Sequence, residues 1–159
     1  MANMRSRFFR NACTCNMTPD NVWTECIAAA QTAMHELGRA HSERAYEDCM
    51  ANYFYHRRIP YMRQRQFFQE VQGEIIPVGV ADLEVAHSVI LELKAGNVNI
   101  NDDHKAQLLR YMHAARNRNK ERSIMGGVFL FGKDGALRVW EHRMPLLQTP
   151  ARQDGTETE

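Results

Sequence analysis

The stretch VADLEVAHSVILELKAG, Val80–Gly96, limits the fold of this chain more than any other segment. It holds two largely apolar runs on either side of His87, which predicts two antiparallel strands joined by a turn. With the turn centred on His87, every facing pair on one side is apolar: Val85 with Val89, Leu83 with Leu91, and Ala81 with Leu93. Such a face belongs against a core, so we expect a sheet that is covered on this side.

The opposite face of the same strand pair carries charge. The register places Asp82 opposite Glu92, with Cβ atoms about 4.5 to 5.5 Å apart, and Lys94 follows on that face. Two facing carboxylates repel each other unless something compensates them. A Mg²⁺ ion would do so, because it takes one or two carboxylates together with water and phosphate oxygens, and Lys94 would then act on the attacking water. A solvent-facing salt-bridge patch is the alternative, and the spacing alone leaves both open.

The remaining segments predict a mixed sheet with packed helices, an α/β fold. Thr18-Pro19 opens a helix that ends at Gly38. The other predicted elements are a helix over 42–57, a strand over 61–71 with a turn at Gln72-Gly73, a helix over 102–117, an apolar strand over 123–132, and a closing strand over 136–144. In the third helix we expect Asp102 or Asp103 as N-cap and an inward face of Ala106, Leu109, Met112 and Ala115.

Composition bounds the class of protein. A chain of 159 residues with 44% hydrophobic and 25% charged residues fits one ordinary globular domain, with no run long enough to span a membrane. Four cysteines follow no secretory signal, so we expect reduced thiols in an intracellular protein of the cytoplasm or nucleus, not a secreted one. The formal net charge is +1, but bases gather in 5–10 and 105–122. Such clusters suit phosphate binding, and equally suit a solvated helix end.

Beyond these local patterns, much of the chain resembles the GxxExxY family of the PD-(D/E)XK nuclease superfamily. The resemblance rests on HELGRAHSERAYEDCMANYFYHRRIP, Arg63-Gln64, Asp82-Leu83, ILELKA at 90–95, HKAQLLRY at 104–111 and the strand ending in Phe131-Gly132, and it spans 27–143. One departure is Ala40, which stands where the family name has glycine, while Glu43 and Tyr46 are retained. Alanine is unfavourable there only if the position needs a positive φ.

The resemblance implies a restriction endonuclease-like core and a role for each matching residue. Asp82 and Glu92 correspond to metal-binding carboxylates, Lys94 to the catalytic lysine, and Glu43 to a helix-borne glutamate that supports the metal site. Gln107 and Tyr111 match a Gln-x-x-x-Tyr motif that approaches the lysine or the substrate phosphate, with His104 one turn earlier. The residues alone favour a plainer interpretation, with Glu43 as a first-turn acid, Tyr46 as packing, and Gln107, Tyr111 and His104 as ordinary helix residues.

The expected function is therefore Mg²⁺-dependent (or Mn²⁺-dependent) hydrolysis of DNA phosphodiester bonds, with low sequence specificity and a homodimer as the working form. Two alternatives remain: a DNA-binding module of nuclease fold without hydrolysis, and a protein-interaction factor. We expect a basic N-terminal arm over 1–17, a nuclease-like domain over 18–144 and a flexible tail over 145–159.

Overall fold

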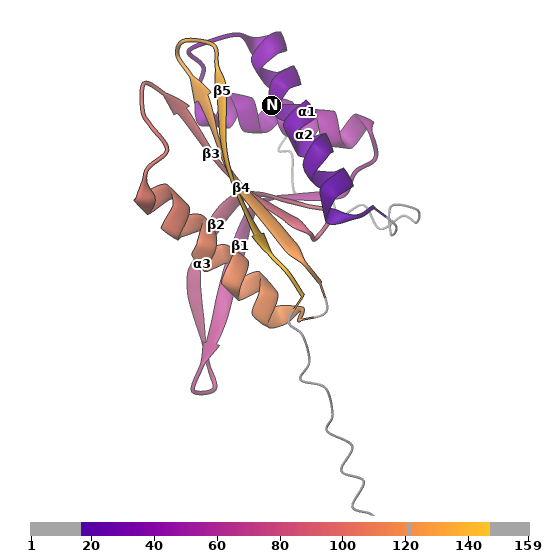
Figure 1. Ribbon diagram of the computed structural model, residues 1–159, viewed down its shortest axis with the longest axis vertical. Helices are drawn as coiled ribbons and strands as arrows, with labels where there is room; N and C mark the ends of the chain where they lie inside the picture. Colours follow the sequence, from indigo (N-terminus) through magenta and orange to yellow (C-terminus); the bar gives the residue numbers. More distant parts are fainter. Residues whose placement is uncertain (1–16, 121, 147–159) are drawn as a thin grey trace, which may run out of the picture.

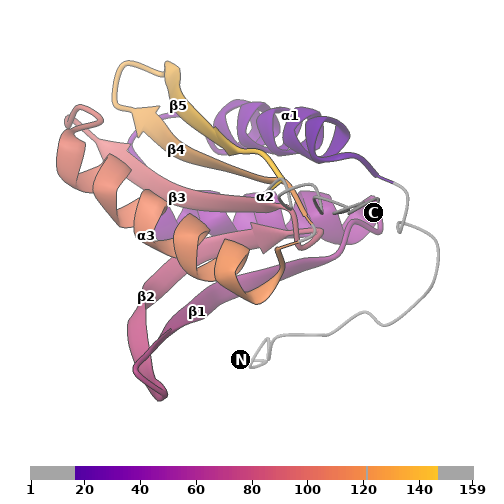
Figure 2. The ribbon, with the colours of Figure 1, turned by 60° about the horizontal axis from the view of Figure 1, so that its bottom comes forward.

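The computed structural model describes residues 17–120 and 122–146, and these form a sheet covered by helices on both faces (Figure 1; Figure 2). The expected basic arm and C-terminal tail lie almost entirely outside the described residues. The elements in chain order are α1 (Pro19–Leu37), α2 (Glu43–His56), β1 (Tyr61–Val71), β2 (Glu74–Val85), β3 (Val89–Gly96), α3 (Asp102–Arg118), β4 (Ile124–Gly132) and β5 (Leu137–Met144). This is the mixed α/β sheet with flanking helices that the sequence predicts.

The five strands are ordered β1-β2-β3-β4-β5, and β3 and β4 are the parallel neighbours. Tight turns join the antiparallel neighbours, whereas α3 forms the crossover between β3 and β4 that a parallel pair requires. Helices α1 and α2 pack on one face and α3 on the other (Figure 2). Every residue of β4 is buried, because this strand lies inside the sheet and is covered on both faces.

Capping residues set the starts of the first two helices, and those of α1 are as predicted. The Thr18 side chain accepts a hydrogen bond from Asn21 N, with Pro19 in the first turn, and α1 ends at Gly38, whose φ is 76°. Ser42 caps α2 by accepting from Ala45 N. No helix among the described residues has both the length and the apolar character needed to cross a membrane.

The third helix differs from the prediction in its cap and in its buried face. Asn101, rather than Asp102 or Asp103, is the N-cap. The buried residues are Leu108, Tyr111, Met112 and Ala114, whereas Ala106 is exposed and Leu109 and Ala115 are half-buried. The predicted stripe is confirmed in part, because Met112 is buried and Leu109 and Ala115 pack against the same cluster. The prediction lacked Tyr111, whose ring stacks on Phe67 of β1 with ring centroids 5.7 Å apart.

The strand pair around His87 is confirmed near the turn and interrupted further out. Leu83 pairs with Leu91 and Val85 with Val89, but the ladder stops there. The predicted facing pairs Asp82–Glu92 and Ala81–Leu93 do not form. Ala81 packs in the cluster on the α3 side, whereas Leu93 packs on the side of α1 and α2. The two strands therefore separate at the position of Asp82.

Candidate active site

The candidate site lies at the point where β2 and β3 separate. The Asp82 carboxylate fills the break in the ladder: Oδ2 accepts a hydrogen bond from the backbone N of Leu93 at 2.7 Å, and Oδ1 accepts one from Nε2 of Gln64 at 3.2 Å. A side chain thus takes the place of a backbone partner, which keeps this buried amide satisfied. Because both carboxylate oxygens have a donor, the orientation of Asp82 is fixed.

Glu92 is buried with one oxygen satisfied and one not. Only 4% of the residue is exposed. Its Oε1 accepts from Nζ of Lys94 at 2.8 Å, whereas Oε2 is buried without any hydrogen-bond partner. A buried carboxylate oxygen without a donor is costly, and buried groups of this kind usually have a partner.

Glu43 brings the start of α2 to the same place. It is the first residue of that helix, and its Oε1 accepts from the backbone N of Ala95 on β3 at 3.3 Å. Its charge is close enough to raise the pKa of Asp82, of Glu92 and of Lys94. Four charged side chains from three elements therefore meet at the break in the sheet.

Burial is the main cause that raises the pKa of both carboxyl groups at this site. Burial, and then the charge of Asp82, raise the pKa of Glu92 from 4.5 to about 7, although Lys94 opposes the shift. Burial also raises the pKa of Asp82. Burial lowers the pKa of Lys94, but the hydrogen bond to Glu92 and the surrounding carboxylates outweigh it, so the lysine pKa is raised and the ammonium form is favoured.

The donor set suits a hard divalent cation. Two carboxylates, one of them with an unpartnered buried oxygen, match what Mg²⁺ or Mn²⁺ takes from a protein when water and substrate phosphate supply the other ligands. Asp82 and Glu92 are the residues that would hold it. Among the described residues, no group of three or more His, Cys, Asp or Glu side chains is arranged so that it could hold a metal ion. A direct ligand role for Glu43 therefore stays a prediction.

Three further residues are linked to Asp82 by hydrogen bonds: Glu47, Arg63 and Gln64. The sequence patterns did not indicate them as site residues. Glu47 is 3% exposed, and it forms an ion pair with Nε of Arg63 at 2.6 Å. Nε2 of Gln64 donates to Oε2 of Glu47 at 2.9 Å as well as to Asp82. The available signal was helical spacing, because Glu47 lies one turn after Glu43 on the same side of α2.

Gln107 and Tyr111 form a pair on α3, but they do not bond to the carboxylates. Nε2 of Gln107 donates to the Tyr111 hydroxyl at 2.8 Å, and neither side chain is hydrogen-bonded to Lys94 in the part of the chain that the structure describes. Tyr111 is 3% exposed and packs against Gly79 and Phe67. A direct approach of this pair to a bound phosphate stays a prediction.

His104 and Tyr46 have structural contacts. Nδ1 of His104 accepts from the backbone N of Asn101, which completes a capping box at the start of α3. The Tyr46 hydroxyl donates to the carbonyl of Gly38 at 2.7 Å, and its ring stacks on Phe131 with centroids 4.1 Å apart. Both contacts agree with the interpretation based on the residues alone.

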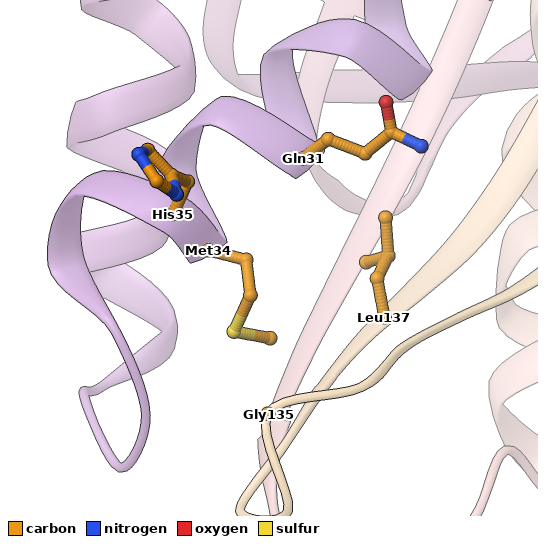
Figure 3. Close-up of a pocket in the computed structure, with 5 residues that line it drawn as sticks. All are labelled: Gln31, Met34, His35, Gly135 and Leu137. Atoms are coloured by element: carbon orange, nitrogen blue, oxygen red, sulfur yellow. The ribbon is translucent and has the colours of Figure 1, made fainter.

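A separate surface pocket lies between α1 and the turn that joins β4 to β5 (Figure 3). Its lining residues are Gln31, Met34, His35, Gly135 and Leu137. None of them is a carboxylate, and none belongs to the site at the break between β2 and β3. The pocket is therefore not part of the candidate active site.

The fold and this site together define an α/β protein with paired acids and a lysine at a break in its sheet. Comparison with known families gives a match between residues 20–123 and the family described as the PD-(D/E)XK nuclease superfamily. The chain belongs to this superfamily. The matched range includes Glu43, Asp82, Glu92, Lys94 and the Gln107–Tyr111 pair. Comparison with curated proteins and with solved structures gave no match.

Proposed function

We propose that this protein is a nuclease that uses Mg²⁺ or Mn²⁺ to hydrolyse phosphodiester bonds in DNA. The observation that supports this most is the buried, unpartnered Oε2 of Glu92 beside Asp82 and Lys94. A buried carboxylate oxygen without a donor lowers the stability of the protein when no ligand is bound. Buried groups of this kind are typical of functional sites. The superfamily to which the chain belongs gives the class of reaction.

In this proposal each side chain has a separate task. Asp82 and Glu92 hold the cation, with Asp82 kept in position by Gln64 and the Leu93 amide. When bound, the ion lowers the pKa of a water molecule and offsets charge on the phosphate. Lys94, whose ammonium form is favoured, lies beside Glu92, where it stabilises negative charge that develops on the phosphate and orients the attacking water.

Exposed bases on α3 and in the segment that follows it supply a surface for the DNA backbone. Arg110, Arg118, Lys120 and Arg122 are exposed, and none of the four forms an ion pair with another described residue. Lysine and arginine contacts with phosphates position the DNA but carry no sequence information. The expected binding is therefore salt-dependent and of low sequence specificity.

We also propose a homodimer, with β1 and its turn into β2 as the contact. Strand β1 is at the edge of the sheet, and the β1–β2 hairpin projects away from the helices (Figure 1; Figure 2). Its exposed apolar residues are Phe68, Val71, Ile75, Ile76 and Val80. Residues 66–80 include Glu70 and Glu74 but no lysine or arginine, so this surface suits a second copy better than phosphate.

The second candidate is a DNA-binding module that does not cut. It is favoured by one observation: the exposed bases of α3 have no hydrogen bond to the carboxylate site, so they could bind DNA without it. Nuclease folds do not guarantee nuclease activity. Binding that is strongly salt-dependent and unchanged by loss of Lys94 or Glu92 would support this candidate.

The experiment that separates the two candidates follows cleavage and binding in the same samples. Plasmid and single-stranded DNA are incubated with wild type or Lys94→Ala in Mg²⁺, Mn²⁺ or EDTA. The control is Glu84→Gln, which also removes a charge from a sheet residue, because Glu84 is buried on β2 and pairs with Arg65 and His87 rather than with the site residues. The proposal expects cutting in metal by wild type and control only. Binding without cutting by all three proteins would reject it.

A further inference from the structure

The pairing of β1 with β2 is irregular at Gln64. Arg63 pairs with Leu83 and Arg65 with Ala81, so Gln64 lies opposite Asp82, yet these two residues do not form a backbone pair. The reason is the backbone of Gln64, whose φ is 49°. Residues other than glycine rarely adopt this left-handed conformation, and they keep it only where the surrounding structure imposes it.

The left-handed backbone directs the Gln64 side chain to two acids. Its Nε2 donates to Oε2 of Glu47 at 2.9 Å and to Oδ1 of Asp82 at 3.2 Å. An amide nitrogen carries two N–H groups, so one glutamine satisfies both acceptors at once. Because both hydrogen bonds use the same nitrogen, the amide joins the two carboxylates directly.

The far end of this connection is rigid. Glu47 is 3% exposed and paired with Arg63, which also pairs with Asp48. The near end is Asp82, whose other oxygen accepts the Leu93 amide. Asp82 is therefore held between β1 on one side and β3 on the other. Loss of the Gln64 amide would leave Asp82 free to turn about its remaining bond.

We propose that Gln64 is a positioning residue that sets the Asp82 carboxylate for the cation, with Glu47 and Arg63 as its anchor. The inference rests on the proposed function, because it concerns the metal-binding state of the same site. Outer groups that orient a metal ligand typically contribute about 10- to 100-fold to metal affinity. The strained backbone at residue 64 is then retained because it aims this amide.

The test uses two substitutions that suit the left-handed backbone but remove the bridge. In Gln64→Asn the amide is one methylene shorter, and in Gln64→Gly it is absent, while both residues accept a positive φ. The matched control is Gln72→Gly, because Gln72 has a φ of 53° in the exposed turn of the same hairpin and no side-chain hydrogen bond among the described residues. All three substitutions relieve backbone strain at a positive φ. Only the two Gln64 variants lose the hydrogen bonds to Glu47 and Asp82.

Two readouts are measured: Mn²⁺ affinity by calorimetry, and hydrogen exchange of the Leu93 amide by NMR in metal-free protein. The inference expects about 10- to 100-fold weaker Mn²⁺ binding and faster Leu93 exchange in both Gln64 variants. Both variants stay folded but melt below wild type, because the buried Glu47 loses a hydrogen-bond donor together with Asp82. Gln72→Gly keeps wild-type values for both. A purely conformational role for Gln64 would leave Mn²⁺ affinity and Leu93 exchange unchanged in Gln64→Gly, and that result overturns the inference.

The two readouts also separate this inference from the proposed function. If wild type binds no Mn²⁺, the proposed function fails whatever the variants do. Leu93 exchange then still decides whether Gln64 positions Asp82: faster exchange in both variants supports the contact, and unchanged exchange rejects it.

Discussion

At the residue scale, the ionisation of Glu92 links the site to stability. The pKa of Glu92 is 4.5 in ordinary surroundings and about 7 in the folded protein. Between pH 4.5 and pH 7, a larger fraction of Glu92 is therefore protonated in the folded protein than in the unfolded chain. Folded protein then holds more protons than unfolded protein, and stability falls as pH rises through this window. The loss is about 3 kcal/mol at most, because each tenfold difference in proton affinity corresponds to about 1.4 kcal/mol.

We therefore predict that metal-free protein unfolds more easily in urea at pH 8 than at pH 5, and that Glu92→Gln reduces this difference. The comparison with the variant is needed because burial raises the pKa of Asp82 in the same direction. Denaturant curves in EDTA at both pH values provide the measurement. Equal pH dependence in wild type and Glu92→Gln would mean that the fold does not raise the pKa of Glu92.

The residues of the site could be predicted from the sequence only in part. Facing positions around His87 indicated that Asp82, Glu92 and Lys94 are close, because strand register follows from apolar pairing. Gln64 and Glu47 could not be found in this way. The role of Gln64 depends on a left-handed backbone inside a strand, which no spacing in the sequence reports. Helical spacing places Glu47 on the same side of α2 as Glu43, but it does not show that this side packs against β1 beside Gln64.

At the element scale, Ala40 makes the entry to α2 less favourable than it could be. Its φ is 62°, so this connection between α1 and α2 does require the conformation that favours glycine. We predict that Ala40→Gly stabilises the protein by about 1 kcal/mol, which raises Tm by about 2 to 4 °C. Calorimetry measures the shift. The control is Ala28→Gly within α1, which should lower stability by a similar amount.

Failure of Ala40→Gly to stabilise, with the expected loss in Ala28→Gly, would mean that the connection does not hold Ala40 at a positive φ in solution.

The contact between α3 and β2 depends on Gly79. A Cβ atom at this position would lie 2.6 Å from Cε1 of Tyr111, and its φ is 141°. We predict that Gly79→Ala lowers stability by about 2 to 3 kcal/mol, because the buried Tyr111 ring is held between Phe67 and β2 and has no space to move. Urea unfolding provides the measurement.

The control for this prediction is Gly73→Ala. Gly73 also has a positive φ, at 82°, but a Cβ atom there would meet nothing within 4 Å. Its loss should be limited to backbone strain, about 1 kcal/mol. Equal losses in both variants would show that the Tyr111 contact contributes nothing beyond the backbone conformation.

Elements with strong local signals agreed with the sequence, and those that depend on tertiary packing did not. The caps Thr18 and Ser42 and the apolar strand β4 were predictable because their cause is local. The face of α3 was predictable only in part, because the stacking of Tyr111 on Phe67 is a contact between residues 44 positions apart in the chain. The end of the β2–β3 ladder was missed because a side chain, Asp82, replaces a backbone partner.

For the whole molecule, we expect a dimer that is formed through the hairpin of β1 and β2. Ile75 is 65% exposed near the tip of that hairpin. We predict that wild type sediments as a dimer and Ile75→Glu as a monomer, because a glutamate at this position faces Glu70 across the strand pair and would be buried without a cation in the contact. Val98→Glu is the control, since Val98 is 49% exposed but lies between β3 and α3. A wild type that stays monomeric at high concentration would contradict the dimer.

In the proposed function, the carboxylates at the break between β2 and β3 hold a divalent cation, and DNA is cut there. The most direct measurement is plasmid cleavage by purified wild type and Glu92→Gln in Mg²⁺, with EDTA samples alongside and folding of both proteins checked by Tm. We expect wild type to convert supercoiled plasmid to nicked or linear DNA only with metal, and Glu92→Gln to be at least about 100-fold slower although it is folded. Equal cleavage by both proteins, or no cleavage by folded wild type in any divalent metal, would contradict it.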